Sequence, residues 1–224
     1  MVRTHFVQAR CFTQYLPGVT LAAQSIMARK KILYTNEHPY HVMARSNNKD
    51  WFYLPISTCW DIFSHTLKDT TYKYGLGVYA FVLMNNHYHL ICQCSDNANL
   101  GEAMNYFQKT TSKIINSRAQ RINHVFGGPY KGSLIRDPQQ FSLIYKYVIR
   151  NPITAGICSK AEEYPYSTFT AKSIALLKEN EWFAEMPENR FDWLNMSFEA
   201  ERYLAINRAL KRTEFKIAER LRRT

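Results

Sequence analysis

Met84-Asn85-Asn86-His87-Tyr88-His89-Leu90-Ile91-Cys92 is the stretch around which the rest of the sequence is organised. The run before it, Val78–Met84, is rich in β-branched and aromatic residues, and Asn85-Asn86 tolerates the left-handed conformation that a tight hairpin needs. The sequence therefore predicts two antiparallel strands joined at the asparagines. Residues two apart on a strand share one face, roughly 6 to 7 Å apart, so His87 and His89 are predicted to clamp one cation.

The two histidines also have a simpler interpretation. A bare His-x-His is often a pair of ordinary core or surface residues. Cys92 and Cys94 share strand parity with Tyr88 and not with the histidines, so an unbroken strand keeps both thiols away from a metal that the histidines bind. A thiolate-rich zinc site is therefore not expected, and the case for a metal depends on residues elsewhere in the chain.

Composition favours a polyanionic partner over a neutral metabolite. The 224 residues are 46% hydrophobic, which is enough for one full-sized core with appendages. Lys and Arg outnumber Asp and Glu by 29 to 18, which gives a formal net charge of +11. The 15 Tyr, 13 Phe and 4 Trp can supply stacking surfaces for unpaired bases. Nucleic acid is accordingly the expected partner.

The cysteines and the apolar segments indicate in which cellular compartment the protein is expected. The 5 cysteines are odd in number and include no Cys-x-x-Cys pair, which fits a reducing environment. No apolar run of signal-peptide length begins the sequence, and no segment approaches the roughly eighteen apolar residues of a membrane span. A cytoplasmic protein without membrane contact is expected.

Three regions are expected along the chain. Residues 1–30 read as an N-terminal extension, and Met27 is a plausible alternative start. Residues 31–170 form the predicted main domain, and residues 171–224 a basic helical C-terminal tail. Within that tail, residues 180–195 carry four large aromatic residues and are expected to dock on the core.

Periodicity and turn residues predict the elements of the main domain. In chain order they are a strand at 40–46, a turn at 47–50, a helix at 56–74 stopped by Gly75, the hairpin, a helix at 100–121 and a strand at 130–136. The order strand, helix, strand, strand, helix, strand predicts an α+β fold. It is a ferredoxin-like split βαβ antiparallel sheet with helices on one face.

A third helix is predicted at 138–151, launched by Asp137 as N-cap and Pro138 at the first helical position. Tyr145 belongs to its apolar stripe, and is expected in the core. Tyr147 and Asn151 lie together on the flank, one turn apart. The hydroxyl of Tyr147 can therefore leave the core, and Asn151 can offer an amide oxygen to a metal near it.

Two stretches together resemble the single-tyrosine HUH transposases, the IS200-like superfamily. Met84–Leu90 matches their motif of two histidines flanking a hydrophobic residue, and Tyr147–Gly156 matches their tyrosine helix. The resemblance spans roughly residues 31–169. It is greatest to the REP-associated tyrosine transposases, in which an asparagine four residues after the tyrosine completes the metal site. The departures are Tyr88 at a position more often aliphatic and Asn85-Asn86 where the family commonly has Pro-Asn, and neither removes a ligand.

The resemblance implies a metal-dependent DNA nicking and joining reaction. His87, His89 and Asn151 would bind Mg²⁺ or Mn²⁺, because two imidazoles and one amide oxygen leave positions open for water and phosphate. Tyr147 would be the nucleophile and would form a covalent link to the DNA 5′ end, leaving a free 3′ hydroxyl. Reversal of that step would join a second strand without ATP.

The implied substrate is single-stranded DNA beside imperfect, REP-like hairpins, acted on by a monomer or a homodimer. Several basic residues near the two motifs are expected to contact phosphates, with Arg150 placed first because it adjoins Asn151. The expected DNA-binding residues are Arg150, Lys131, Arg136, Lys113, Arg118 and Arg121.

Alternatives remain open at the level of sequence. A domesticated hairpin-binding protein could keep the fold without transposing. A two-histidine phosphoesterase is a third class, but it requires a repeated His-x-Ser or His-x-Thr motif that the sequence lacks. The final predicted helix, at 197–223, is either a charged surface helix or a basic arm that grips a hairpin stem or shields the active site.

Overall fold

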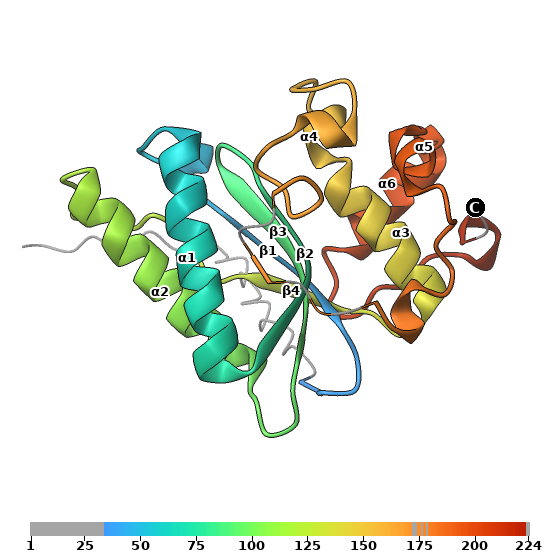
Figure 1. The fold of residues 1–224 in the computed structure, drawn as a ribbon, viewed down its shortest axis with the longest axis horizontal. Helices are drawn as coiled ribbons and strands as arrows, with labels where there is room; N and C mark the ends of the chain where they lie inside the picture. Colours follow the sequence, from blue (N-terminus) through green and yellow to red (C-terminus); the bar gives the residue numbers. More distant parts are fainter. Residues whose placement is uncertain (1–33, 172–173, 176, 178, 223–224) are drawn as a thin grey trace, which may run out of the picture. The chain divides into compact units, whose positions relative to one another are not determined.

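A four-stranded antiparallel sheet forms the centre of the computed structural model, which describes residues 34–171, 174–175, 177 and 179–222 (Figure 1). The strands lie in the order β2-β3-β1-β4. This order places β3 between β1 and β2, as a ferredoxin-like split βαβ sheet requires, and it confirms the predicted α+β class. The strands are β1 (Tyr40–Arg45), β2 (Leu76–Leu83), β3 (His87–Cys94) and β4 (Lys131–Leu134).

The helices begin and end at residues whose chemistry explains the boundaries. α1 ends at Gly75, whose φ of 60° is the left-handed conformation that a glycine adopts without steric cost. Asn99 caps α2 and Asp137 caps α3, each by accepting hydrogen bonds from main-chain N–H groups of the first turn. The helices are α1 (Ile56–Tyr74), α2 (Leu100–Arg118), α3 (Pro138–Ile149), α4 (Asn151–Thr154), α5 (Arg190–Asn195) and α6 (Ala200–Ala209), with 3-10 turns η1 (Asn47–Lys49), η2 (Ala161–Glu163), η3 (Glu181–Phe183) and η4 (Glu219–Leu221).

The turn between β2 and β3 differs from the prediction. Asn85 and Asn86 do not adopt a left-handed conformation; positive φ angles occur instead at Asn48 and Lys49, in the predicted turn after β1. Three residues connect the strands, and the carbonyls of both asparagines are held by N–H groups of the segment after β1, at 2.7 and 2.8 Å. The main-chain N–H of Met84 donates to the oxygen of His87 at 2.8 Å, so the predicted hairpin at the asparagines forms without the left-handed conformation, and the hydrogen bonds to the neighbouring segment hold it.

Helices cover both faces of the sheet, which corrects the prediction of helices on one face. α1 and α2 cover the first face, where Phe63, Phe81 and Phe107 are fully buried. α3 and α6 cover the second face, with Ile144 and Ile206 in its core (Figure 1). The physical reason is that β2 is apolar at nearly every position, so both of its faces must be shielded from water.

Both outer edges of the sheet are covered by later parts of the chain. On the β4 edge, Leu134 exchanges main-chain hydrogen bonds with Thr213 and Phe215, at 3.0 and 2.9 Å. On the β2 edge, main-chain groups of residues 166–168 and of Leu177 pair with the strand. The C-terminal residues are thus part of the sheet architecture.

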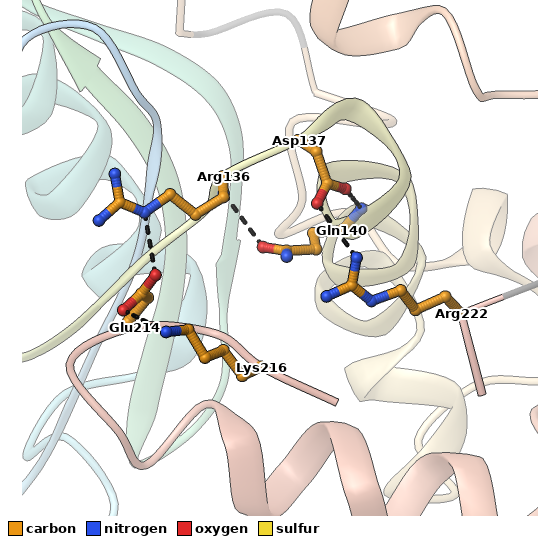
Figure 2. A network of polar contacts seen from close by, with 6 residues as sticks. All are labelled: Arg136, Asp137, Gln140, Glu214, Lys216 and Arg222. Atoms are coloured by element: carbon orange, nitrogen blue, oxygen red, sulfur yellow. Dashed lines mark hydrogen bonds and ion pairs between the residues drawn. The ribbon is translucent and has the colours of Figure 1, made fainter. Parts of the chain in front are cut away.

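Ion pairs reinforce the contact between the C-terminal segment and the connection from β4 to α3, as Figure 2 shows. Glu214 lies between two cations, Arg136 at 2.9 Å and Lys216 at 3.0 Å. Arg222 lies 3.5 Å from Asp137, the residue that caps α3. Part of the positive charge of this segment is therefore balanced within the fold.

The C-terminal region is less helical than predicted but docks as expected. The predicted helix at 197–223 is helical only over α6 and a short 3-10 turn, because the intervening residues pair with β4. Trp182 and Trp193 are buried against α3, which confirms the expected docking of residues 180–195. The predicted extension at 1–30 and the alternative start at Met27 lie outside the described residues.

None of the helices within the described residues is long and apolar enough to cross a membrane.

Replacing Ile206 by Ala tests whether α6 contributes to the core. The side chain is fully buried, so truncation should lower the free energy of unfolding by about 2 to 5 kcal/mol. Leu204→Ala is the matched control on the same helix, because its side chain is 51% exposed and its loss should change stability by less than about 0.5 kcal/mol. Urea denaturation measures both; equal losses for the two variants would contradict this packing.

Candidate active site

His87 and His89 lie on the second face of the sheet, the face that α3 covers. His87 is half-buried at the start of β3, and His89 is buried. Their ring centroids are 5.2 Å apart. The predicted parity is confirmed, since Tyr88, Cys92 and Cys94 belong to the core on the opposite face.

Hydrogen bonds fix the orientation of both imidazoles. The Nδ1 atom of His87 lies 2.7 Å from Oδ1 of Asn86, and Nδ1 of His89 lies 2.8 Å from Nε2 of His41. The Nδ1–H of His87 can thus be donated to Asn86, which leaves Nε2 of His87 as the ring atom with a lone pair, whereas either His89 or His41 can be the donor in the contact between them. Such partners set the tautomer and orientation of histidines that bind metals.

Burial keeps these imidazoles neutral. It lowers the pKa of His87 to about 4, with a further contribution from the positive charge of Arg45. Burial also lowers the pKa of His41 to about 3 and that of His89 well below its usual range. A neutral imidazole is the form that binds a metal ion, so no proton has to be displaced at neutral pH.

The end of α3 brings Tyr147 and Asn151 to the histidines. Asn151 donates from Nδ2 to the main-chain oxygen of Tyr147 at 2.8 Å, and its side chain also hydrogen-bonds His89. The ring centroids of Tyr147 and His89 are 5.8 Å apart. Asn151 begins α4 after a break at Arg150, so the predicted helix to 151 ends two residues early, yet the two side chains remain one turn apart.

The four predicted residues can be compared with what a divalent metal requires. Within the described residues, no group of three His, Cys, Asp or Glu side chains is arranged so that it could hold a metal ion, so a metal here would depend on two imidazoles and one amide oxygen. Asn151 uses its Nδ2 on a main-chain carbonyl, so its Oδ1 is the atom available toward His89. This donor set fits Mg²⁺ or Mn²⁺ that keeps open positions for water and phosphate, and it does not fit a closed thiolate zinc site.

The side chain of Tyr147 is covered by α6. It is only 6% exposed, its hydroxyl accepts a hydrogen bond from Nδ2 of Asn207 at 3.0 Å, and the ring of Tyr203 lies 5.8 Å away between centroids. Burial raises the pKa of Tyr147 to about 12, and the bond from Asn207 opposes part of this increase. The sequence suggested that the C-terminal region either grips a hairpin stem or shields the active site. The position of α6 over Tyr147 corresponds to shielding. Tyr145 packs against Phe141 in the core, as predicted.

The six predicted DNA-binding residues have different surroundings. Arg150 is buried and donates to the main-chain oxygen of Leu194 at 2.6 Å, and its expected contact with a phosphate stays a prediction. Arg136 is exposed but paired with Glu214. The remaining four are exposed: Lys113, Arg118, Arg121 and Lys131.

Among these four residues, the structure gives specific neighbours for Lys131 and Arg121. Lys131 pairs with Met43, which in turn pairs with His89, so all three stand in one row on the second face of the sheet. The Arg121 guanidinium lies 3.5 Å from the ring centroid of Tyr53, a cation–π contact between the end of α2 and the loop after β1. Lys131 therefore lies in the row of His89, and Arg121 is held beside the loop after β1.

Two residues of β1 join the site that the sequence did not identify as functional. His41 orients His89, and Arg45 is the cross-strand partner of His87 and is exposed. The charge of Arg45 lowers the pKa of His87 and of Tyr147, so its field reaches both. Strand parity places His41 and Arg45 on one face, but only the register of β1 against β3 shows that this face carries the histidines.

The fold is similar to that of a REP-associated tyrosine transposase solved bound to a REP hairpin. The TM-score is 0.56 at 14% sequence identity, over 64% of this chain and 83% of that chain. A candidate transposase from Deinococcus radiodurans R1 is a more distant match, with a TM-score of 0.38 and 13% identity over 49% of this chain and 87% of that chain. A likeness at that TM-score supports no further statement.

Residues 34–151 match the model of the family described as "Transposase IS200 like". The match covers more than half of the chain, and the chain belongs to the IS200-like transposase family. No curated protein sequence matches it significantly. Family membership assigns the chain to DNA processing related to transposition.

The buried imidazoles should make the metal-free protein sensitive to mild acid. Well above the ordinary histidine pKa of about 6.5, neither the folded nor the unfolded chain protonates them. Below about pH 6.5 the unfolded chain binds protons that the folded chain excludes, so the free energy of unfolding falls by up to about 1.4 kcal/mol per pH unit for each histidine. For His87 this loss continues to its folded pKa of about 4, and for His41 to about 3.

Urea titrations in a chelator between pH 7.5 and 5 measure this slope, with the pH values chosen to bracket the ordinary histidine pKa of about 6.5. His41→Gln should flatten the slope. Leu204→Ala should leave it unchanged, because the variant removes no titratable group and the side chain of Leu204 is 51% exposed. An identical slope in the parent protein and His41→Gln would contradict a buried neutral imidazole.

Proposed function

We propose that this protein is a metal-dependent enzyme that nicks and joins single-stranded DNA at hairpin-flanked sites through a 5′-phosphotyrosine intermediate. The observation that carries the proposal is the convergence of Tyr147 and Asn151 from one helix end on His87 and His89 from one strand. Nucleophile and metal ligands within reach of one phosphate are what this reaction needs.

A bound Mg²⁺ or Mn²⁺ would supply positive charge that polarises the scissile phosphate and stabilises the leaving oxygen. His87, His89 and Asn151 would hold it. His41 and Asn86 would keep the two imidazoles in the orientation and tautomer that binding requires. Arg45, exposed beside His87, would attract the DNA backbone to this end of the sheet.

In the cleavage step, the Tyr147 oxygen attacks phosphorus and forms a new P–O bond. The bond from phosphorus to the 3′ oxygen of the preceding nucleotide breaks with its electron pair, and that oxygen ends with the proton that the phenol loses. Because burial raises the pKa of Tyr147 to about 12, the phenol is protonated at neutral pH, and proton loss must accompany attack.

Joining is the same step in reverse. A 3′ hydroxyl attacks the phosphotyrosine, the new P–O3′ bond forms, and Tyr147 leaves and regains a proton. The energy of the original phosphodiester is kept in the covalent adduct, so no nucleotide cofactor is required. Cleavage and strand transfer therefore need only one set of side chains.

The proposed substrate is DNA with REP-like imperfect hairpins. Support comes from the similar fold of the transposase that was solved with a REP hairpin, and from the net charge of +11. A flexible single strand can place a phosphate beside Tyr147 more readily than a regular duplex. All four predicted site residues come from one chain, so a monomer can supply the complete site, although a homodimer is equally compatible with the proposal.

A second candidate is a hairpin-binding protein that no longer cleaves. One observation favours it: Asn207 and Tyr203 cover the proposed nucleophile, so DNA cannot reach Tyr147 without a movement of α6. A two-histidine phosphoesterase has no such support, since its second motif is absent from the sequence.

Tyr147→Phe should abolish the covalent protein–DNA adduct and leave hairpin affinity nearly unchanged, because only the attacking hydroxyl is removed. Tyr145→Phe is the matched control: it should form the adduct and lose at most about 1 kcal/mol of stability. Denaturing gels with end-labelled hairpin DNA and Mn²⁺ or Mg²⁺ detect the adduct, and a titration measures affinity. An adduct with Tyr147→Phe would assign the nucleophile elsewhere, and none with the parent protein would favour the non-cleaving binder.

Substitution of the proposed ligands should weaken metal binding itself. His87→Ala, His89→Ala and Asn151→Ala each remove one donor, and His41→Gln should reduce Mn²⁺ affinity by about 10- to 100-fold, because His89 loses its orienting partner. Electron paramagnetic resonance of free Mn²⁺ measures affinity without DNA, and His65→Ala is the exposed control. Parent-like affinity in all of the site variants would reject the metal site.

A further inference from the structure

Lys146 of α3 is a buried lysine that the proposed reaction does not use. Its side chain is only 6% exposed, and the ring centroids of Trp193 and Phe198 lie 5.2 and 5.1 Å from its Nζ atom. A cation over the face of an aromatic ring is attracted by that ring. The two rings therefore hold the ammonium at a fixed place between α3, α5 and the segment that leads into α6 (Figure 1).

The charges that act on this ammonium are both positive. They belong to Arg150, about one turn later on α3, and to Arg202 in the first turn of α6. Burial, followed by these two charges, lowers the pKa of Lys146 to about 8, so the ammonium is still largely protonated at neutral pH. Within the described residues, no Asp or Glu forms an ion pair with Lys146.

The donors of this cluster are only partly used by the fold. A buried charge is stable only when it is paired or hydrogen-bonded. Lys146 makes no hydrogen bond with a described residue, yet its Nζ atom is not fully buried, so a small solute can reach it. Arg150 uses Nη1 on the main-chain oxygen of Leu194 at 2.6 Å, which fixes its guanidinium and leaves further N–H groups for a second acceptor.

We propose that Lys146, Arg150 and Arg202 form a binding site for a small free oxyanion of the phosphate class. Ammonium and guanidinium groups donate charge-assisted hydrogen bonds to phosphate oxygens, and the guanidinium fork matches two oxygens at once. The bound anion would compensate the three positive charges and connect α3 to α6. The site does not require that the protein cleaves DNA.

Burial favours a free anion over a phosphate of the DNA backbone. A backbone phosphate has a nucleotide on each side, so its binding site must be open enough for a strand to lie along it. Lys146 and Arg150 are only 6% and 7% exposed, which leaves too little surface for such a strand. A free phosphate has no such attachments and needs only the small opening at Nζ.

Urea denaturation in a chelator measures binding to the folded protein when inorganic phosphate replaces chloride at constant ionic strength. The parent protein should become more stable as phosphate rises. Lys146→Met and Arg202→Gln should each weaken phosphate binding by about 10-fold, because each removes a charged donor. Without phosphate, Lys146→Met should be at least as stable as the parent protein, since it removes an uncompensated charge and keeps an unbranched side chain between the rings.

Lys211→Met is the matched control, because it makes the same change at an exposed position just after α6, and it should bind phosphate as the parent protein does. A parent protein that phosphate stabilises no more than chloride, or parent-like phosphate affinity in both site variants, would overturn the site.

Titration with labelled hairpin DNA, with and without saturating phosphate at constant ionic strength, separates the two sources of a phosphate group. Hairpin affinity should not depend on phosphate. Competition between phosphate and the hairpin in the parent protein, but not in Lys146→Met, would instead assign these residues to the DNA backbone and reject a free anion. None of these measurements uses adduct formation, so loss of the proposed chemistry leaves the site unaffected.

Discussion

The side chain of His89 joins the sheet to the helix that carries the tyrosine. Its Nδ1 lies 2.8 Å from His41, and its ring is hydrogen-bonded by Asn151 and packed edge-on against Tyr147. One imidazole therefore sets the relation between β1, β3 and the end of α3. This constraint depends on both faces of the sheet being covered, since α3 must lie on the face opposite α1 and α2 to meet the histidine. Placement of every other candidate group follows from this arrangement.

Local sequence patterns were sufficient to predict the helices and strands, but not to predict that helices cover both faces of the sheet. The bounds of α1, its stop at Gly75 and the cap at Asp137 follow from residues within one turn of each boundary. The second helical layer did not follow, because a strand that is apolar at nearly every position shows that both faces are buried without showing what buries them. The left-handed turn at Asn85 was wrong for a related reason: distant N–H groups hold that turn, and local propensity does not report them.

The same distinction applies to the candidate site. His87, His89, Tyr147 and Asn151 could be proposed from spacing, because the two members of each pair are close together in the sequence. His41 and Arg45 could not, since their relation to His87 and His89 depends on strand register. Arg150 adjoins Asn151 in the sequence, but its own side chain is buried and reaches the carbonyl of Leu194. Adjacency along a helix is a poor guide to direction, since successive residues point about 100° apart.

The covered edges of the sheet limit how two copies of this protein can associate. Residues 213–215 occupy the hydrogen-bonding groups of Leu134 on β4, and residues 166–168 with Leu177 occupy those of β2. An exposed strand edge is a template for pairing with another chain. With Leu134 of β4 and several residues of β2 already paired, few main-chain groups of the outer strands are left for extending the sheet from one subunit into the next. Shortening the chain before Thr213 would uncover β4 and open a route to intermolecular strand pairing that the intact protein lacks.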